Sequence, residues 1–203
     1  MVLGAMLFVG SVVLSVNNQQ ENYSAEQSSA EVMPELIDQI RENVKATLSS
    51  SDPLPELQKP VEVLTEEEKK MTEVMINGIP YIGYLSIPKL DLDLPIISTW
   101  DYSRLNVAPC RFTGTVLGED LVLLAHNYAS HFGRISQLEV GDTVLFTDMA
   151  GQQILYEVVG KDILPPDAVE EMTSGYFDLT LFTCTYGGQS RVTIYCDRAE
   201  TAQ

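Results

Sequence analysis

A series of short strand-like segments after Asn77-Gly78 constrains the fold most strongly. An Asn-Gly pair between apolar runs is typical of a tight hairpin turn, here joining Val74–Ile76 to a strand that begins near Tyr81. The later segments are rich in Val, Ile and Leu and are separated by turn residues. They are Gly83–Ile87, Leu92–Ile97, Leu121–Ala125, Thr143–Thr147, Ile154–Ile163, Leu179–Cys184 and Val192–Cys196. Eight or so strands with few helices predict a mainly β fold, a closed or nearly closed eight-stranded β-barrel with short helices, preceded by an N-terminal helical segment.

Composition divides the chain into four parts. Residues 1–16 carry no charge, and we expect them to be the outer part of an N-terminal membrane anchor whose start lies outside this chain, or alternatively a cleaved signal peptide. Residues 17–30 are rich in Asn, Gln, Ser and Glu, which is typical of a linker. Residues 31–73 are predicted to be a helical appendage followed by a second linker, and residues 74–203 the β-barrel domain.

Four helices are predicted outside the strands. Glu31–Leu48 has an apolar stripe at helical spacing, with Pro34 tolerated in its first turn, and the stripe is expected to pack on the barrel. Short helices are predicted at Ser130–Leu138 and around Asp167–Met172. A capping-box pattern at Thr65–Glu68 predicts the start of another. The stripe consists of Val32, Leu36, Ile37, Ile40, Val44 and Leu48.

Charge and cysteine content exclude two classes of function. The net charge of −17 argues against a nucleic-acid partner, because such a chain cannot neutralise phosphates. Three cysteines, Cys110, Cys184 and Cys196, are too few and too irregularly spaced for a disulfide scaffold or a zinc site. At least one thiol is free, and buried free thiols are favoured over a Cys110–Cys196 disulfide.

Three chemically active side chains lie at the ends of predicted strands. His126 follows the apolar run Leu121–Ala125, Cys184 ends Leu179–Cys184, and Arg191 opens the next strand. A Cys-His pair supplies a nucleophilic thiolate and a group that protonates a leaving amine. A guanidinium stays charged and stabilises an oxyanion. The alternative interpretation is a packed cysteine, a surface histidine and a solvated arginine, with His131 as the only competing histidine.

The same residues resemble the signatures of a known family. Thr180–Cys184, Ala125-His126-Asn127 and Arg191 are similar to the TLxTC, histidine and arginine motifs of sortases, the membrane-anchored cysteine transpeptidases of Gram-positive bacteria. The resemblance extends over about residues 79–198. It includes Tyr81–Pro88, which is similar to the first strand of the family, and His131–Asp142, which matches the pattern after the catalytic histidine.

The resemblance implies a role for each site residue. Cys184 resembles the nucleophile, His126 the acid/base and Arg191 the residue that stabilises the oxyanion or positions substrate. Ala125 replaces a glycine often found before the histidine, and His131 is expected to be structural or a substrate contact. The resemblance places no metal in the chemistry. The residues expected to contact substrate are Thr183, Tyr186, Ala125 and Asn127.

The resemblance also implies a substrate and a location. Such an enzyme cleaves an LPXTG-type C-terminal sorting signal of surface proteins, holds the acyl fragment as a thioester, and passes it to an amine of the peptidoglycan precursor. A pilin-polymerising sortase that uses a lysine amine is the alternative in the same fold. An exported, non-catalytic β-barrel binding module is the alternative from another class. The expected location is the cell membrane, with a single N-terminal anchor and an extracellular catalytic domain.

Three further features carry predictions of their own. Glu119, Asp120, Glu170 and Glu171 could bind calcium, as some sortases do, although acid pairs are commoner as solvated surface. Asp52-Pro53-Leu54 resembles the lid of pilus-building sortases but lacks its aromatic residue. The loop from Pro165 to Gly175 matches the position of the family's loop over the substrate groove. Its residues Val169, Met172 and Tyr176 could contact an apolar part of the substrate or pack in the core.

Overall fold

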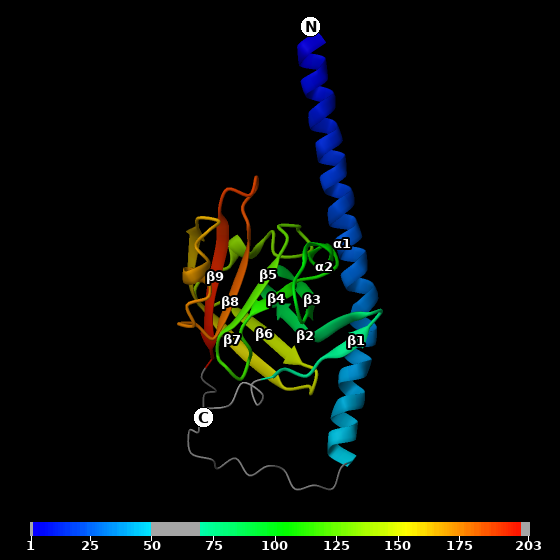
Figure 1. Cartoon of the computed structure of the whole chain (residues 1–203), viewed down its shortest axis with the longest axis vertical. Helices are drawn as coiled ribbons and strands as arrows, with labels where there is room; N and C mark the ends of the chain where they lie inside the picture. Colours follow the sequence, from blue (N-terminus) through cyan, green and yellow to red (C-terminus); the bar gives the residue numbers. More distant parts are fainter. Residues whose placement is uncertain (1, 50–69, 200–203) are drawn as a thin grey trace.

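Eight strands form a closed barrel in the computed structural model, which describes residues 2–49 and 70–199 (Figure 1). The strand order is β1-β2-β3-β4-β5-β8-β9-β7-β6, and β2 also pairs with β6, so the sheet closes on itself with β1 as an outer hairpin strand. The predicted fold class is therefore confirmed. The strands are β1 Val74–Ile76, β2 Ile79–Ile87, β3 Leu92–Ile97, β4 Cys110–Thr113, β5 Leu121–Ala125, β6 Thr143–Asp148, β7 Gln153–Leu164, β8 Leu179–Cys184 and β9 Arg191–Arg198.

Two strands at the centre of the sheet are buried on both faces. β5 and β8 lie parallel to each other, and most of their side chains are buried. Leu121, Leu123 and Leu181 point into the barrel core. On the outer face Val122 and Phe182 pack with other apolar residues. Continuous apolar runs in the sequence reflect this double burial, because a strand with one solvated face alternates instead.

The turn chemistry of the first hairpin is as predicted. Asn77 and Gly78 have φ angles of 51° and 78°, the positive values that a type I′ turn needs at both central positions. Gly83 permits the barrel to close where β2 meets β6. A Cβ built on it would lie 2.1 Å from the carbonyl oxygen of Thr147, so any larger side chain would separate the two strands.

One long helix replaces the predicted linker at residues 17–30. α1 runs without interruption over Val2–Ser49 and lies along the side of the barrel (Figure 1). Residues 17–30 contain no Pro or Gly, and their Gln, Glu and Ala residues are good helix formers. Pro34 is therefore inside a helix rather than in a first turn. Within the described part of the chain, no helix has an apolar stretch long enough to cross a membrane.

Packing on the barrel explains why the helix continues through the polar segment. The buried positions of α1 recur every three or four residues and extend N-terminal of the predicted stripe. Ala25 and Ser29 are buried with Val32, Leu36 and Ile40, but a small residue and a serine give no apolar periodicity to detect. Val44 is only partly buried and Leu48 is exposed. The stripe over residues 32–40 packs against the barrel as predicted.

The remaining helices are short. They are η1 Pro88–Leu90, α2 Tyr102–Leu105, η2 Ile135–Gln137 and α3 Val169–Met172. The predicted helix at Ser130–Leu138 is reduced to η2, because tight turns occupy the residues before it. The helix near Asp167–Met172 is confirmed as α3, whereas β4 and α2 were not predicted. The predictions for residues 49–69, which include the capping-box helix at Thr65 and the lid-like Asp52–Leu54, fall almost entirely outside the described residues.

Candidate active site

The strand register brings His126 and Cys184 together. In the parallel pair β5–β8, Ala125 lies opposite Thr183, so the next residue of each strand leaves the sheet at the same end. The hydroxyl of Thr183 fixes this register, because its Oγ1 donates a hydrogen bond to the carbonyl oxygen of Ala125 at 2.8 Å. A buried bond of this kind joins the two strands directly behind the two candidate catalytic residues.

Arg191 lies beside Cys184 on the other side. The antiparallel pair β8–β9 places Cys184 and Arg191 directly opposite each other at the last rung of the ladder. Nη1 of Arg191 donates to the carbonyl oxygens of Gly188 and Ser190, each at 3.2 Å, so the guanidinium is held against its own hairpin loop. A guanidinium has five N–H groups, and both of these contacts use Nη1.

The three residues line one cleft of about 210 Å³. Its wall is aromatic: the rings of Trp100 and Phe112 have centroids 5.7 Å apart, and Phe112 meets Phe182 edge to face at 5.5 Å. A mostly apolar cleft with a few polar groups at one end is typical of a ligand site. The lining residues are Trp100, Tyr102, Leu105, Phe112, Leu124, Ala125, His126, Pro166, Val169, Met172, Phe182, Thr183, Cys184 and Arg191.

The other predicted contact residues divide into two groups. Ala125 and Thr183 line the cleft, but both are almost fully buried, so Thr183 acts mainly through its bond to Ala125. Asn127 and Tyr186 are exposed and lie outside the set of residues that lines the cleft. In the loop after Pro165, Val169 and Met172 line the cleft, whereas Tyr176 is exposed.

Sequence reasoning missed the aromatic wall. Trp100, Tyr102 and Phe112 lie on segments with no strong strand or helix pattern. Trp100 follows β3, Tyr102 begins α2 and Phe112 belongs to β4, and all three line the cleft. The single tryptophan of the chain was the one available signal, because large aromatic side chains are enriched at binding surfaces.

Of the three thiols, only Cys184 is partly exposed. All three cysteines are free, and Cys110 and Cys196 are fully buried. Burial raises the pKa of the Cys110 thiol to about 12, and burial also raises the pKa of Cys196. A thiol acts as a nucleophile only as thiolate, so the two buried cysteines are inert and Cys184 is the one available for chemistry.

His126 is half-buried, and two features of its surroundings shift its pKa in opposite directions. Burial lowers its pKa, and the negative charge of Glu21 on α1 opposes this with a smaller rise. Its ring lies against Tyr128, with centroids 4.8 Å apart. A neutral imidazole near physiological pH is ready to accept a proton, as a general base must.

Turns and α1 hold the loop that carries His126. The carbonyl oxygen of His126 accepts a hydrogen bond from the N–H of Phe132 at 3.2 Å. From α1, Oδ1 of Asn22 accepts a hydrogen bond from the N–H of Ala129 at 2.8 Å. His131 is fully buried beneath the loop, with Nε2 3.5 Å from the hydroxyl of Ser29. His131 is therefore a structural residue here, and α1 is part of the wall behind the site.

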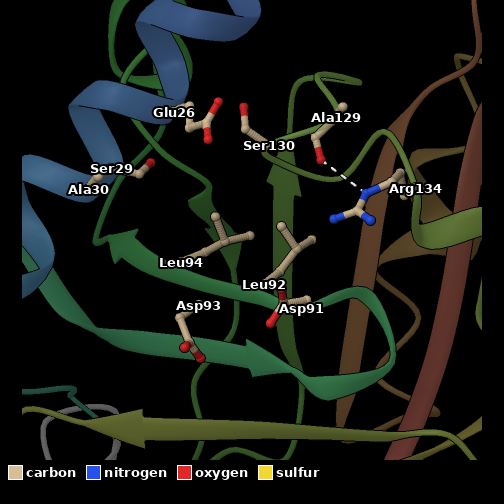
Figure 2. Close-up of a pocket in the computed structure, with 10 residues that line it drawn as sticks. All are labelled: Glu26, Ser29, Ala30, Asp91, Leu92, Asp93, Leu94, Ala129, Ser130 and Arg134. Atoms are coloured by element: carbon tan, nitrogen blue, oxygen red, sulfur yellow. Dashed lines mark hydrogen bonds between the residues drawn. The ribbon is translucent and has the colours of Figure 1, made fainter.

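Two further hollows lie where α1 meets the loop. The larger, about 480 Å³, is lined by residues of α1, by the start of β3 and by Ala129, Ser130 and Arg134. In Figure 2 the Glu26 carboxylate faces the Ser130 hydroxyl, and Arg134 donates to the carbonyl oxygen of Ala129. The second hollow, about 450 Å³, adjoins Tyr128 and is lined by Gln20, Glu21, Ser24, Asn106 and Tyr128.

Two of the four acidic residues considered for calcium already have partners within the protein. Glu119 forms a salt bridge with Arg198 at 3.0 Å, and Asp120 accepts a hydrogen bond from the N–H of Thr115. Glu170 and Glu171 belong to α3. Over residues 2–49 and 70–199, no group of three or more His, Cys, Asp or Glu residues is arranged to hold a metal ion.

Comparisons with known proteins agree with this geometry. Residues 85–199 match the model of the sortase domain. Sortase C1 from Streptococcus suis is 28% identical, with 60% of this chain and 74% of that chain covered at a TM-score of 0.54. Sortase C from Streptococcus pneumoniae is 22% identical, with 84% and 97% covered at a TM-score of 0.58. Sortase C from Clostridium perfringens SM101 is 21% identical, with 94% and 99% covered at a TM-score of 0.54.

No curated protein matches the chain. The domain model nevertheless covers more than half of its length, from the middle of β2 to the residue after β9. The match includes the strands that carry His126, Cys184 and Arg191. The chain belongs to the sortase family, and it is a cysteine transpeptidase.

Proposed function

We propose that this sortase cleaves an LPXTG-type sorting signal of surface proteins and transfers the acyl fragment from Cys184 to a primary amine. The observation that carries the proposal is the meeting of Cys184, His126 and Arg191 in one cleft with an aromatic wall. The wall suits the apolar leucine and proline of such a signal. The three polar groups stand at the end where a scissile bond would lie.

In the acylation step, neutral His126 takes the proton of the Cys184 thiol, and the resulting thiolate attacks the carbonyl carbon of the scissile peptide bond. The negative charge that develops on the carbonyl oxygen is stabilised by Arg191, whose guanidinium remains charged. The peptide C–N bond then breaks, and protonated His126 gives its proton to the leaving amine. The acyl fragment remains on Cys184 as a thioester.

Two acceptors fit this chemistry: an amine of the peptidoglycan precursor and a lysine amine of another protein. The likeness to sortase C structures supports the second, since the Streptococcus pneumoniae structure is described in connection with pilin substrate specificity.

We further propose that the uncharged segment at residues 1–16 anchors the chain to the cell membrane of a Gram-positive bacterium, with the catalytic domain outside.

Intact mass measurement after incubation with LPXTG-type peptides tests the acylation step. We expect an adduct equal to the acyl fragment in the wild type and none in Cys184→Ala or His126→Ala. Cys110→Ala is the matched control, because it removes a buried thiol and should keep the adduct. Absence of an adduct with a panel of sorting-signal peptides would refute the proposal. An adduct that survives in Cys184→Ala would place the nucleophile elsewhere.

A further inference from the structure

The second step of the reaction needs an entrance for the amine. After acylation the acyl fragment fills the aromatic cleft beside Cys184, so the acceptor has to approach the thioester from another side. His126 has to take a proton from the attacking amine, and therefore the acceptor has to arrive next to its ring. The ring of Tyr128 lies against that of His126, with centroids 4.8 Å apart, and Tyr128 also lines the hollow of about 450 Å³. None of the residues that line this hollow lines the aromatic cleft.

The lining of this hollow is polar and includes one charged side chain, the carboxylate of Glu21. The lining residues are Gln20, Glu21, Ser24, Asn106 and Tyr128. Burial raises the pKa of Tyr128, and the charge of Glu21 adds a smaller rise. The same charge opposes the fall that burial causes in the pKa of His126. A carboxylate is thus close to the catalytic histidine without lining the cleft for the acyl fragment.

The position of Glu21 is fixed by the packing of its helix. The next residue, Asn22, accepts the hydrogen bond from the N–H of Ala129 at 2.8 Å, and its carbonyl oxygen accepts one from Ser130 at 3.3 Å. Ala25, one turn further along α1, is fully buried. The backbone at Glu21 therefore belongs to a wall built by α1 and the loop after His126, and the exposed carboxylate extends from a fixed point on that wall.

We propose that this hollow receives the acceptor of the transpeptidation, a protonated primary amine, with Glu21 as the counter-ion that draws the ammonium group to His126. The inference rests on the proposed function. It also gives α1 a role in substrate choice, because an acceptor with a positive charge would be preferred to a neutral nucleophile of equal reactivity.

The chemistry of this step balances as follows. The ammonium group loses one proton to water and becomes a free amine beside His126. Its nitrogen attacks the thioester carbonyl, forming a C–N bond, and gives a second proton to Nε2 or Nδ1 of the neutral imidazole. The C–S bond breaks, and Cys184 leaves as thiolate. The products are the amide, the thiolate and protonated His126, which is the state that begins the next acylation.

Steady-state kinetics of the full chain with two nucleophiles test this inference. One probe is Nα-acetyl-lysine amide, whose side-chain amine is positively charged, and the other is hydroxylamine, which is neutral at pH 7.5. We expect Glu21→Gln to raise the KM for the lysine amide relative to the KM for hydroxylamine by roughly two- to fivefold, the size of a solvent-exposed ion pair. The difference should shrink as salt is added.

Glu26→Gln is the matched control, because Glu26 lies on the same helix but lines the other hollow (Figure 2). It should leave the ratio of the two KM values unchanged. An unchanged ratio in Glu21→Gln, or an equal change in Glu26→Gln, would overturn the inference. The thioacyl adduct is measured separately by mass, so failure at the amine site with a normal adduct refutes the acceptor site alone.

Discussion

Truncating Leu36 to alanine tests whether α1 is a structural part of the enzyme. Leu36 is fully buried between the helix and the barrel, in a cluster with Val32, Ile40, Ile76 and Tyr81. A buried Leu→Ala change removes apolar contacts and leaves a cavity, so we expect the free energy of unfolding to fall by about 2–5 kcal/mol. A loss of about 3 kcal/mol lowers the melting temperature of a domain of this size by roughly 6–12 °C.

Leu48→Ala provides the control on the same helix, because Leu48 is 82% exposed. Its melting temperature should stay close to that of the wild type, as surface changes away from special features cost little. Thermal unfolding is followed by circular dichroism, and urea unfolding gives the free energies. If Leu36→Ala and Leu48→Ala unfold alike, α1 does not pack on the barrel in solution. The placement of Glu21 beside His126 would then lose its basis.

Three more predictions concern the residues around the site. Thr183→Val should cost about 1–2 kcal/mol in urea unfolding, because the carbonyl oxygen of Ala125 loses its partner, and Thr183→Ser should restore most of this. Arg191→Lys should lower kcat by roughly 100- to 1000-fold with little change in unfolding free energy, and an equal fall in both would mark Arg191 as structural. Burial lowers the pKa of His131 from 6.5 to about 4, so the unfolded chain binds a proton first and stability falls as the pH drops through this range. Between pH 7 and pH 5 this contribution is about 2 kcal/mol, and a His131→Gln variant that keeps the full pH slope would refute it.

The strands and the three site residues were predictable because their signals are local. Buried strands such as Leu121–Ala125 and Leu179–Cys184 can be recognised from their apolar composition. A polar residue at the end of such a strand has to lie at the edge of the sheet. Cys184 and Arg191 are also separated by a loop short enough to make them neighbours. The parallel pairing that sets His126 beside Cys184 is not local, and the sequence did not predict it.

The parts that sequence missed depend on tertiary contacts. Residues 17–30 read as a linker because their buried positions are Ala25 and Ser29, which carry little apolar signal. The short strand β4 contains Arg111 and a single large apolar side chain, so its composition does not indicate a strand. Its extended conformation is set by the pairing with β5. Nothing in the order of residues indicates that Glu21 lies near His126, since more than a hundred residues separate them.

The length of α1 sets a distance between the active site and the N-terminal end of the helix. Glu21 lines a hollow together with Tyr128, the ring neighbour of His126. From Glu21 the helix continues to Val2, which at 1.5 Å per residue is about 30 Å. In Figure 1 the β8–β9 hairpin loop points in the same direction as this free portion of the helix. A surface that binds the N-terminal end of the helix would therefore lie at a fixed distance from the catalytic cleft. A substrate attached to the same surface would reach the cleft only if the segment that attaches it is long enough to span that distance.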